Sequence, residues 1–127
     1  TQGKLRHAED IGGHAIIGWE AGTAGIGAAD WLAEHVPPSA FVYRSNSLVN
    51  QSIAAKAGVG ITLLPCYLGD SETGLARALA TPITEIAGEL WIVTHVDLKQ
   101  TARVRAFFDL VGEALIRERD LFEGRRL

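Results

Sequence analysis

Residues 44–68 read RSNSLVNQSIAAKAGVGITLLPCYL and indicate the fold class of this chain. The polar side chains at 45–47 suit the N-terminal cap of a helix, which we expect over 48–57. Gly58 supplies a left-handed C-terminal cap, and the apolar run ITLLP at 61–65 is typical of a strand covered on both faces. This order predicts a helix start at the edge of a parallel sheet, where small anions bind.

The helix expected over 48–57 has a simple apolar pattern. Val49, Ile53 and Ala57 fall at four-residue spacing, which predicts one stripe packed on the sheet. We expect its polar residues to face solvent: Asn50, Gln51 and Lys56.

Two further elements precede this stretch. The run HAIIGW at 14–19 predicts a strand, and AADWLAEH at 28–35 predicts a helix. The prolines at 37–38 should end that helix, because proline lacks an N–H donor and disfavours helical geometry in the residue before it. The strand-forming residues at 40–43 then predict a second strand.

Three further elements are expected after the stretch at 44–68. LARALA at 75–80 suits a strand or a short helix, and we favour a strand. The β-rich run LWIVTHV at 90–96 predicts a central strand buried on both faces. From Thr101 a helix is expected, with one apolar face made of Val104, Phe107, Phe108, Val111 and Leu115. Alternating strands and helices predict an α/β fold with a mostly parallel sheet and flanking helices.

Composition limits the classes of function. The chain has 127 residues and is 47% hydrophobic, enough for one packed core. Its 12 Lys and Arg against 15 Asp and Glu give a formal charge of −3, without the basic surplus that binds duplex DNA or an anionic membrane. The single cysteine, Cys66, excludes an internal disulfide. No apolar run approaches the roughly 20 residues of a membrane span. The start, TQGKLRHAED, has no signal-peptide core, so we expect a cytoplasmic protein.

The stretch at 44–68, followed by ELWIVTHVDLKQTARVRAFFDLVGEAL at 89–115, resembles the C-terminal part of LysR-type transcriptional regulators. The resemblance rests on a polar cap and helix, an AGxGIxxLP strand, a strand like LWIV and a helix like RVRAF. These motifs are degenerate one by one, but their order and spacing cover more than half of the chain.

The resemblance implies a regulatory module, not an enzyme, with a fold similar to periplasmic solute-binding proteins. In that fold two α/β subdomains enclose a ligand cleft. Residues 14–89 would belong to the second subdomain, and residues 90–127 would return to the first. The chain would then hold only part of the module. DNA would be contacted only through an N-terminal helix-turn-helix outside this chain, and the full-length protein is expected to form a homodimer or homotetramer.

The resemblance also suggests which residues border the cleft. The polar turn before the helix and the residue preceding it, the loop at Gly22–Gly27, and the end of the 61–65 strand lie there in the family. The residues expected to contact a small-molecule effector are Arg44, Ser45, Asn46, Ser47, Thr23, Pro65 and Cys66.

Each of these residues also has a plain structural interpretation. Residues 45–47 suit an ordinary helix cap, Arg44 a solvated strand end, and Pro65 the end of a strand. Cys66 suits a small buried apolar side chain better than a redox sensor or nucleophile. Three tryptophans, Trp19, Trp31 and Trp91, are expected in the core, although Trp19 at a strand end also suits the cleft.

Cofactor and metal chemistry has little support in the sequence. The loop GTAGIG at 22–27 matches neither G-x-G-x-x-G nor a phosphate-binding G-K-[ST] motif. The four histidines lack the paired spacing of metal ligands, so we expect no metal and no cofactor. Two alternatives stay open: a solute-binding protein of a transporter, which shares the fold, and an α/β enzyme that uses Cys66 or the glycine loop.

Overall fold

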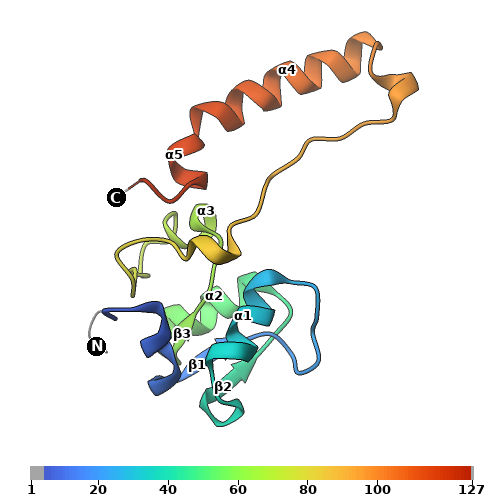
Figure 1. Ribbon diagram of the computed structural model, residues 1–127. Coiled ribbons are helices and arrows are strands. Elements are labelled where there is room, and N and C mark those ends of the chain that lie inside the picture. Colours follow the sequence, from blue (N-terminus) through green and yellow to red (C-terminus); the bar gives the residue numbers. More distant parts are fainter. Residues whose placement is uncertain (1–4, 127) are drawn as a thin grey trace.

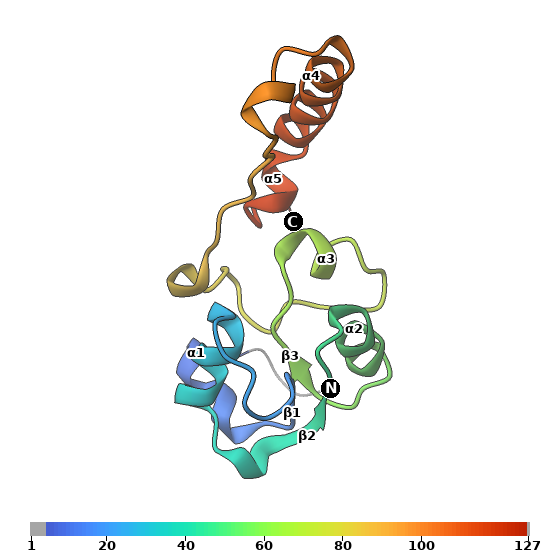
Figure 2. The same ribbon diagram turned by 90° about the vertical axis from the view of Figure 1, so that its right-hand side faces the viewer.

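Three short parallel strands form the centre of the structure, a computed structural model that describes residues 5–126 (Figure 1). The strands are β1 (Ile16–Gly18), β2 (Phe41–Arg44) and β3 (Ile61–Thr62), in the order β2-β1-β3. Two α-helices connect them, α1 (Gly27–His35) and α2 (Leu48–Lys56). Figure 2 shows α1 and α2 on opposite sides of the sheet. The predicted α/β fold with a parallel sheet and flanking helices is confirmed.

The core lies between β1 and α1. Ile16 and Leu32 are almost fully buried there, and Trp19 and Trp31 are buried beside them. Further contacts come from the short 3-10 helices η1 (Ala8–Gly13) and η3 (Thr84–Ile86), which both pack near α1. The prediction that Trp19 and Trp31 belong to the core is confirmed.

The local signals around α1 and α2 act as expected. α1 ends at His35, before the prolines at 37–38, and the 3-10 turn η2 (Pro38–Ala40) leads into β2. Ser47 is the N-cap of α2, and Gly58 has a φ of +79°, the left-handed conformation that glycine adopts without strain.

The predicted orientation of α2 is wrong. Gln51 is 0% exposed and Ser52 is buried, whereas Ile53 is 60% exposed and Val49 is similarly exposed. The helix therefore lays a polar and small-residue side on β1 and β3. Burial of Gln51 is possible because both ends of its amide have hydrogen-bond partners.

Two predicted strands are absent from the described residues. Residues 75–80 are irregular, and residues 90–95 are extended without a partner strand. Trp91 is 73% exposed, so its predicted place in the core is wrong. High β-propensity was the basis of the prediction at 90–96, whereas the pattern at 75–80 suited a strand or a short helix alike. A strand also requires a neighbour whose backbone groups complete its hydrogen bonds.

The C-terminal residues form an arm that extends away from the sheet (Figure 1). After η4 (Val96–Leu98), the arm contains α4 (Ala102–Arg117) and α5 (Arg119–Phe122). The predicted helix after Thr101 is confirmed, although none of its residues is buried. The arm returns to the body where α5 meets α3 (Cys66–Gly69), with the Tyr67 and Phe122 rings 5.2 Å apart. No helix within residues 5–126 has the length and hydropathy needed to cross a bilayer.

Candidate functional site

The carboxyl ends of β1 and β2 meet the start of α2, and Asn46 connects them. Its side-chain oxygen accepts a hydrogen bond from the Glu20 backbone N–H at 3.2 Å and one from the Thr23 hydroxyl at 3.1 Å. The Ser45 backbone N–H donates to the Gly18 carbonyl oxygen at 2.9 Å. The loop after β1 is thereby joined to the turn after β2.

The first turn of α2 has an N-terminal cap and two further backbone N–H groups without an acceptor among the described residues. The Ser47 hydroxyl oxygen accepts from the Asn50 N–H at 3.3 Å, and the Ser45 hydroxyl oxygen accepts from the Ser47 N–H at 3.1 Å. Within the described residues, the N–H groups of Leu48 and Val49 have no acceptor. These donors and the positive end of the helix dipole favour a negatively charged group.

The buried side chain of Gln51 holds this turn through hydrogen bonds at both ends of its amide. Its amide nitrogen donates to the Ser45 carbonyl oxygen at 2.7 Å, and its amide oxygen accepts from the Thr62 hydroxyl at 2.8 Å. One buried side chain thus links the cap of α2 to β3, so all three strands contribute to the polar edge. We define the polar edge as Thr23, Arg44, Ser45, Asn46, Ser47, Gln51 and Thr62.

Arg44 brings a positive charge to this edge. Its guanidinium donates to the Trp19 carbonyl oxygen at 2.9 Å and lies 3.9 Å from the centroid of the Phe41 ring. The side chain is half-buried, and no carboxylate of the described residues pairs with it. Arg44 is therefore not a freely solvated strand end. It is a cation held by a hydrogen bond and an aromatic ring, without a paired carboxylate among the described residues.

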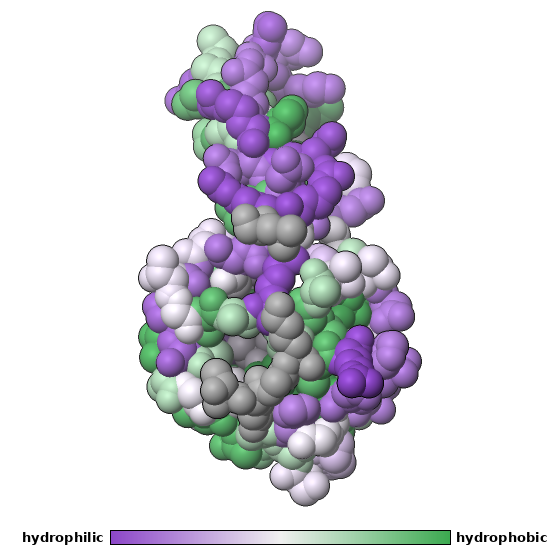
Figure 3. Space-filling view, turned by 90° about the vertical axis from the view of Figure 1, so that its left-hand side faces the viewer, coloured by the Kyte–Doolittle hydropathy of each residue, from purple (hydrophilic) through white to green (hydrophobic). Residues whose placement is uncertain are grey.

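Pro65 and Cys66 lie apart from these contacts. Pro65 precedes α3, and Cys66 borders a pocket of about 680 Å³ beside β3. Apolar side chains supply much of the lining, and Figure 3 shows apolar residues at the surface on this side of the body. None of the hydrogen bonds of the polar edge involves either residue.

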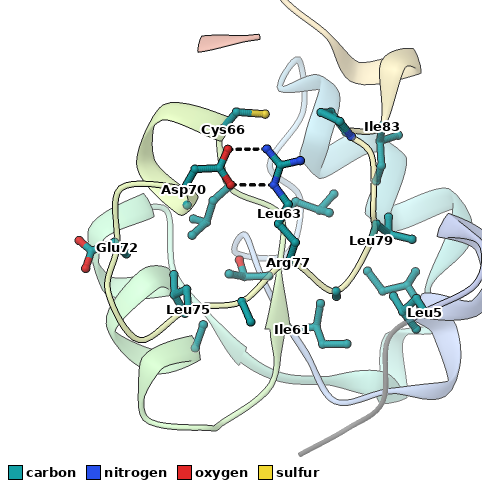
Figure 4. Close-up of a pocket in the computed structure, with 18 of the residues that line it drawn as sticks. Leu5, Ile61, Leu63, Cys66, Asp70, Glu72, Leu75, Arg77, Leu79 and Ile83 are labelled. Atoms are coloured by element: carbon teal, nitrogen blue, oxygen red, sulfur yellow. Dashed lines mark hydrogen bonds and ion pairs between the residues drawn. The ribbon is translucent and has the colours of Figure 1, made fainter. Parts of the chain in front are cut away.

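An ion pair spans this pocket, as Figure 4 shows. Arg77 donates two hydrogen bonds to Asp70, at 2.8 and 2.6 Å, and one to the Gly124 carbonyl oxygen at 2.6 Å. The hydrogen bond from Arg77 holds the pKa of the Asp70 carboxyl below its ordinary value, against the opposing effect of burial. The same bond raises the pKa of Arg77. This pair joins α3 to the C-terminal tail and has no free charge for a ligand.

The structure brings together five of the seven residues expected at the site: Thr23, Arg44, Ser45, Asn46 and Ser47. Sequence analysis missed Gln51 and Thr62. No signal in the sequence identified them, because Leu48, Gln51, Ser52 and Ala55 share one helix side just as Val49, Ile53 and Ala57 share another. Within residues 5–126, no group of three His, Cys, Asp or Glu side chains is arranged to hold a metal ion.

A family model described as the LysR substrate binding domain matches residues 1–116. Neither the curated proteins nor the solved structures gave a match.

Proposed function

The chain belongs to the LysR substrate-binding domain family, and from this premise we propose that it senses a small organic anion for a DNA-binding transcriptional regulator. Members of this family are regulatory ligand-binding domains with a fold like that of periplasmic binding proteins. The identity of the ligand and its place on this chain are our proposal.

The polar edge is the observation that carries the proposal. It lies beyond the carboxyl ends of parallel strands, where ligands of open α/β sheets bind. It combines the unpaired N–H groups of Leu48 and Val49 with the cation of Arg44. A carboxylate there gains about 0.3–1 kcal/mol from the helix terminus at an exposed site and up to about 2 when partly buried.

The hydrogen bonds of Asn46 make the edge a connected unit. Because Asn46 joins the β1 loop at Thr23 to the cap of α2, a ligand that contacts one segment also affects the other. A ligand that binds one arrangement of the module more tightly shifts the population toward it. In the full-length protein, this shift would change how DNA-binding segments outside this chain are presented, by linkage. Such a regulator would act in the cytoplasm as a homo-oligomer.

Titration with a panel of small carboxylic acids, each paired with its neutral amide, tests the proposal. Isothermal titration calorimetry measures binding directly, because the indole of Trp19 is buried and only its backbone carbonyl oxygen contacts Arg44. We expect at least one acid to bind, and its amide to bind at least tenfold more weakly. Asn46→Ala should weaken that binding several-fold.

Ser39→Ala is the matched control, because Ser39 is exposed and lies on η2, outside the polar edge. Equal affinity for acids and amides would contradict the anionic ligand. Equal binding by Asn46→Ala and Ser39→Ala would contradict this location.

A further inference from the structure

We propose that the pocket beside β3 binds a small uncharged molecule that carries one secondary amide between apolar groups. Its volume of about 680 Å³ lies within the roughly 300–1,000 Å³ of small-molecule sites. The pocket follows the side edge of the sheet, along β3 from Gly60 to Leu64. It is therefore a second site, separate from the strand ends where the polar edge lies.

Branched apolar side chains from two segments face each other across the pocket. Ile61 and Leu63 belong to β3 and its continuation, and Leu75 and Leu79 belong to the irregular segment after α3. Figure 4 shows these four side chains around the pocket. A ligand with apolar groups would remove their surface from water, which favours binding.

The charged side chains that line the pocket all have oppositely charged partners. The ion pairs are Asp70–Arg77, Lys56–Glu72 and Arg126–Glu118, at 2.6, 2.7 and 3.0 Å. A charged ligand would lose hydration there without meeting a free counter-charge among the described residues. This balance of charge selects an uncharged ligand.

The outer edge of β3 offers one pair of backbone groups to a ligand. The Ile61 N–H donates to the Ala15 carbonyl oxygen at 2.9 Å, so the backbone groups of Ile61 point toward β1. Those of the next residue, Thr62, then point away from β1, and no described residue is bonded to them. Thr62 lines the pocket. A secondary amide has the acceptor and the donor that complete both bonds.

The shortness of β3 favours a small molecule over a peptide strand. β3 has two residues, so its outer edge bonds a single amide unit. A peptide that adds to a sheet gains its affinity from a row of main-chain hydrogen bonds, which this edge does not provide.

Isothermal titration calorimetry with N-benzylbenzamide tests the proposal, because this compound has one secondary amide between two apolar rings. Benzyl benzoate is the matched ligand, since its ester has a similar shape without the N–H donor. We expect the amide to bind, and the ester to bind about tenfold more weakly through loss of one hydrogen bond. N-benzoylglycine has the same amide beside a carboxylate and should also bind more weakly than the uncharged amide.

Substitutions in the lining test the location. Leu79→Glu should weaken binding of the amide about tenfold or more, because it places a charge among apolar groups. Leu79→Met keeps the lining apolar and should preserve the affinity to within about twofold. Leu115→Glu is the matched control, because Leu115 is also half-buried but lies on α4, outside the pocket. Circular dichroism checks that each variant is folded.

Cys66 provides a second measure of location, because it is the only cysteine of the chain and lines the pocket. Bound N-benzylbenzamide should slow its alkylation by iodoacetamide. Asn46→Ala should leave the affinity for the amide unchanged, so this test is independent of the proposed anion site.

The proposal would be overturned if the amide did not bind up to its solubility limit, or if the ester bound as tightly. The same conclusion would follow if Leu79→Glu and Leu115→Glu had equal effects on binding. Tighter binding of a capped valine tripeptide than of the amide would also overturn it, in favour of strand addition to β3.

Discussion

Thr62 on β3 donates a 2.8 Å hydrogen bond to the side-chain oxygen of Gln51 on α2, and this contact sets the position of the polar edge. The amide nitrogen of Gln51 donates to the Ser45 carbonyl oxygen at 2.7 Å. The cap of α2 is therefore held at a fixed place above the sheet by a side chain that never meets solvent.

Replacing Gln51 by leucine should lower the free energy of unfolding by about 1–3 kcal/mol. The apolar side chain leaves the half-buried Ser45 carbonyl and Thr62 hydroxyl without these partners. Urea denaturation followed by circular dichroism measures the loss. The control is Asn50→Ala, since Asn50 is exposed, and a change within about 0.5 kcal/mol is expected there. Similar losses in both variants would show that Gln51 has no special role.

Replacing Ser47 by alanine should destabilise the chain by about 1 kcal/mol, because the Asn50 N–H loses its acceptor. The same change should weaken binding of an anionic effector, since the first turn of α2 holds the ligand in our proposal. Ser39→Ala again serves as the control. Unchanged stability in Ser47→Ala would contradict the capping role, whatever its effect on binding.

Replacing Gly60 by alanine should cost about 1–3 kcal/mol through overpacking. A Cβ atom at Gly60 would collide with the backbone carbonyl oxygen of Ala15, the acceptor of the Ile61 N–H at 2.9 Å. Pairing of β1 with β3 would therefore be disturbed. A Cβ atom at Gly88 meets open space, so Gly88→Ala should leave the melting temperature nearly unchanged. A neutral Gly60→Ala would mean that β3 shifts without cost.

Local patterns in the sequence were enough to predict most of the body. Ser47, Gly58 and the prolines at 37–38 mark the ends of helices through their own backbone chemistry, and each acts where expected. The orientation of α2 was not predictable in this way. Burial of Gln51 depends on Thr62, eleven residues away, and a four-residue apolar spacing carries no information about that partner.

The segment at 90–95 likewise could not be predicted from its local sequence. Its residues have high β-propensity, but within residues 5–126 no strand pairs with it. For the site, residues 23 and 44–47 were expected from the resemblance, and the structure joins them through Asn46. Whether Pro65 and Cys66 contact an effector stays a prediction, as do the subdomain boundaries.

Replacing Asp70 by asparagine should destabilise the chain at neutral pH by about 1–3 kcal/mol, since the Asp70 side chain is only 13% exposed and bonds a charged partner. Folding lowers the pKa of Asp70 through its hydrogen bond to Arg77. Its contribution is therefore fully present above the pKa of the unfolded chain and is lost as the pH falls through the lower folded value. The difference in free energy of unfolding between wild type and Asp70→Asn should accordingly shrink on acidification.

Unfolding in urea at a series of pH values from 7 downward measures this difference. Glu72→Gln is the matched control, because the Lys56–Glu72 pair is 2.7 Å long but its side chains are 41% and 32% exposed. Such surface pairs contribute about 0–1 kcal/mol, so the control should change little. A difference for Asp70→Asn that stays constant down to acidic pH would mean that its cause is not the ionised carboxylate. Arg77→Met should cost at least as much as Asp70→Asn, because it also removes the hydrogen bond to Gly124 that holds the C-terminal tail on the body.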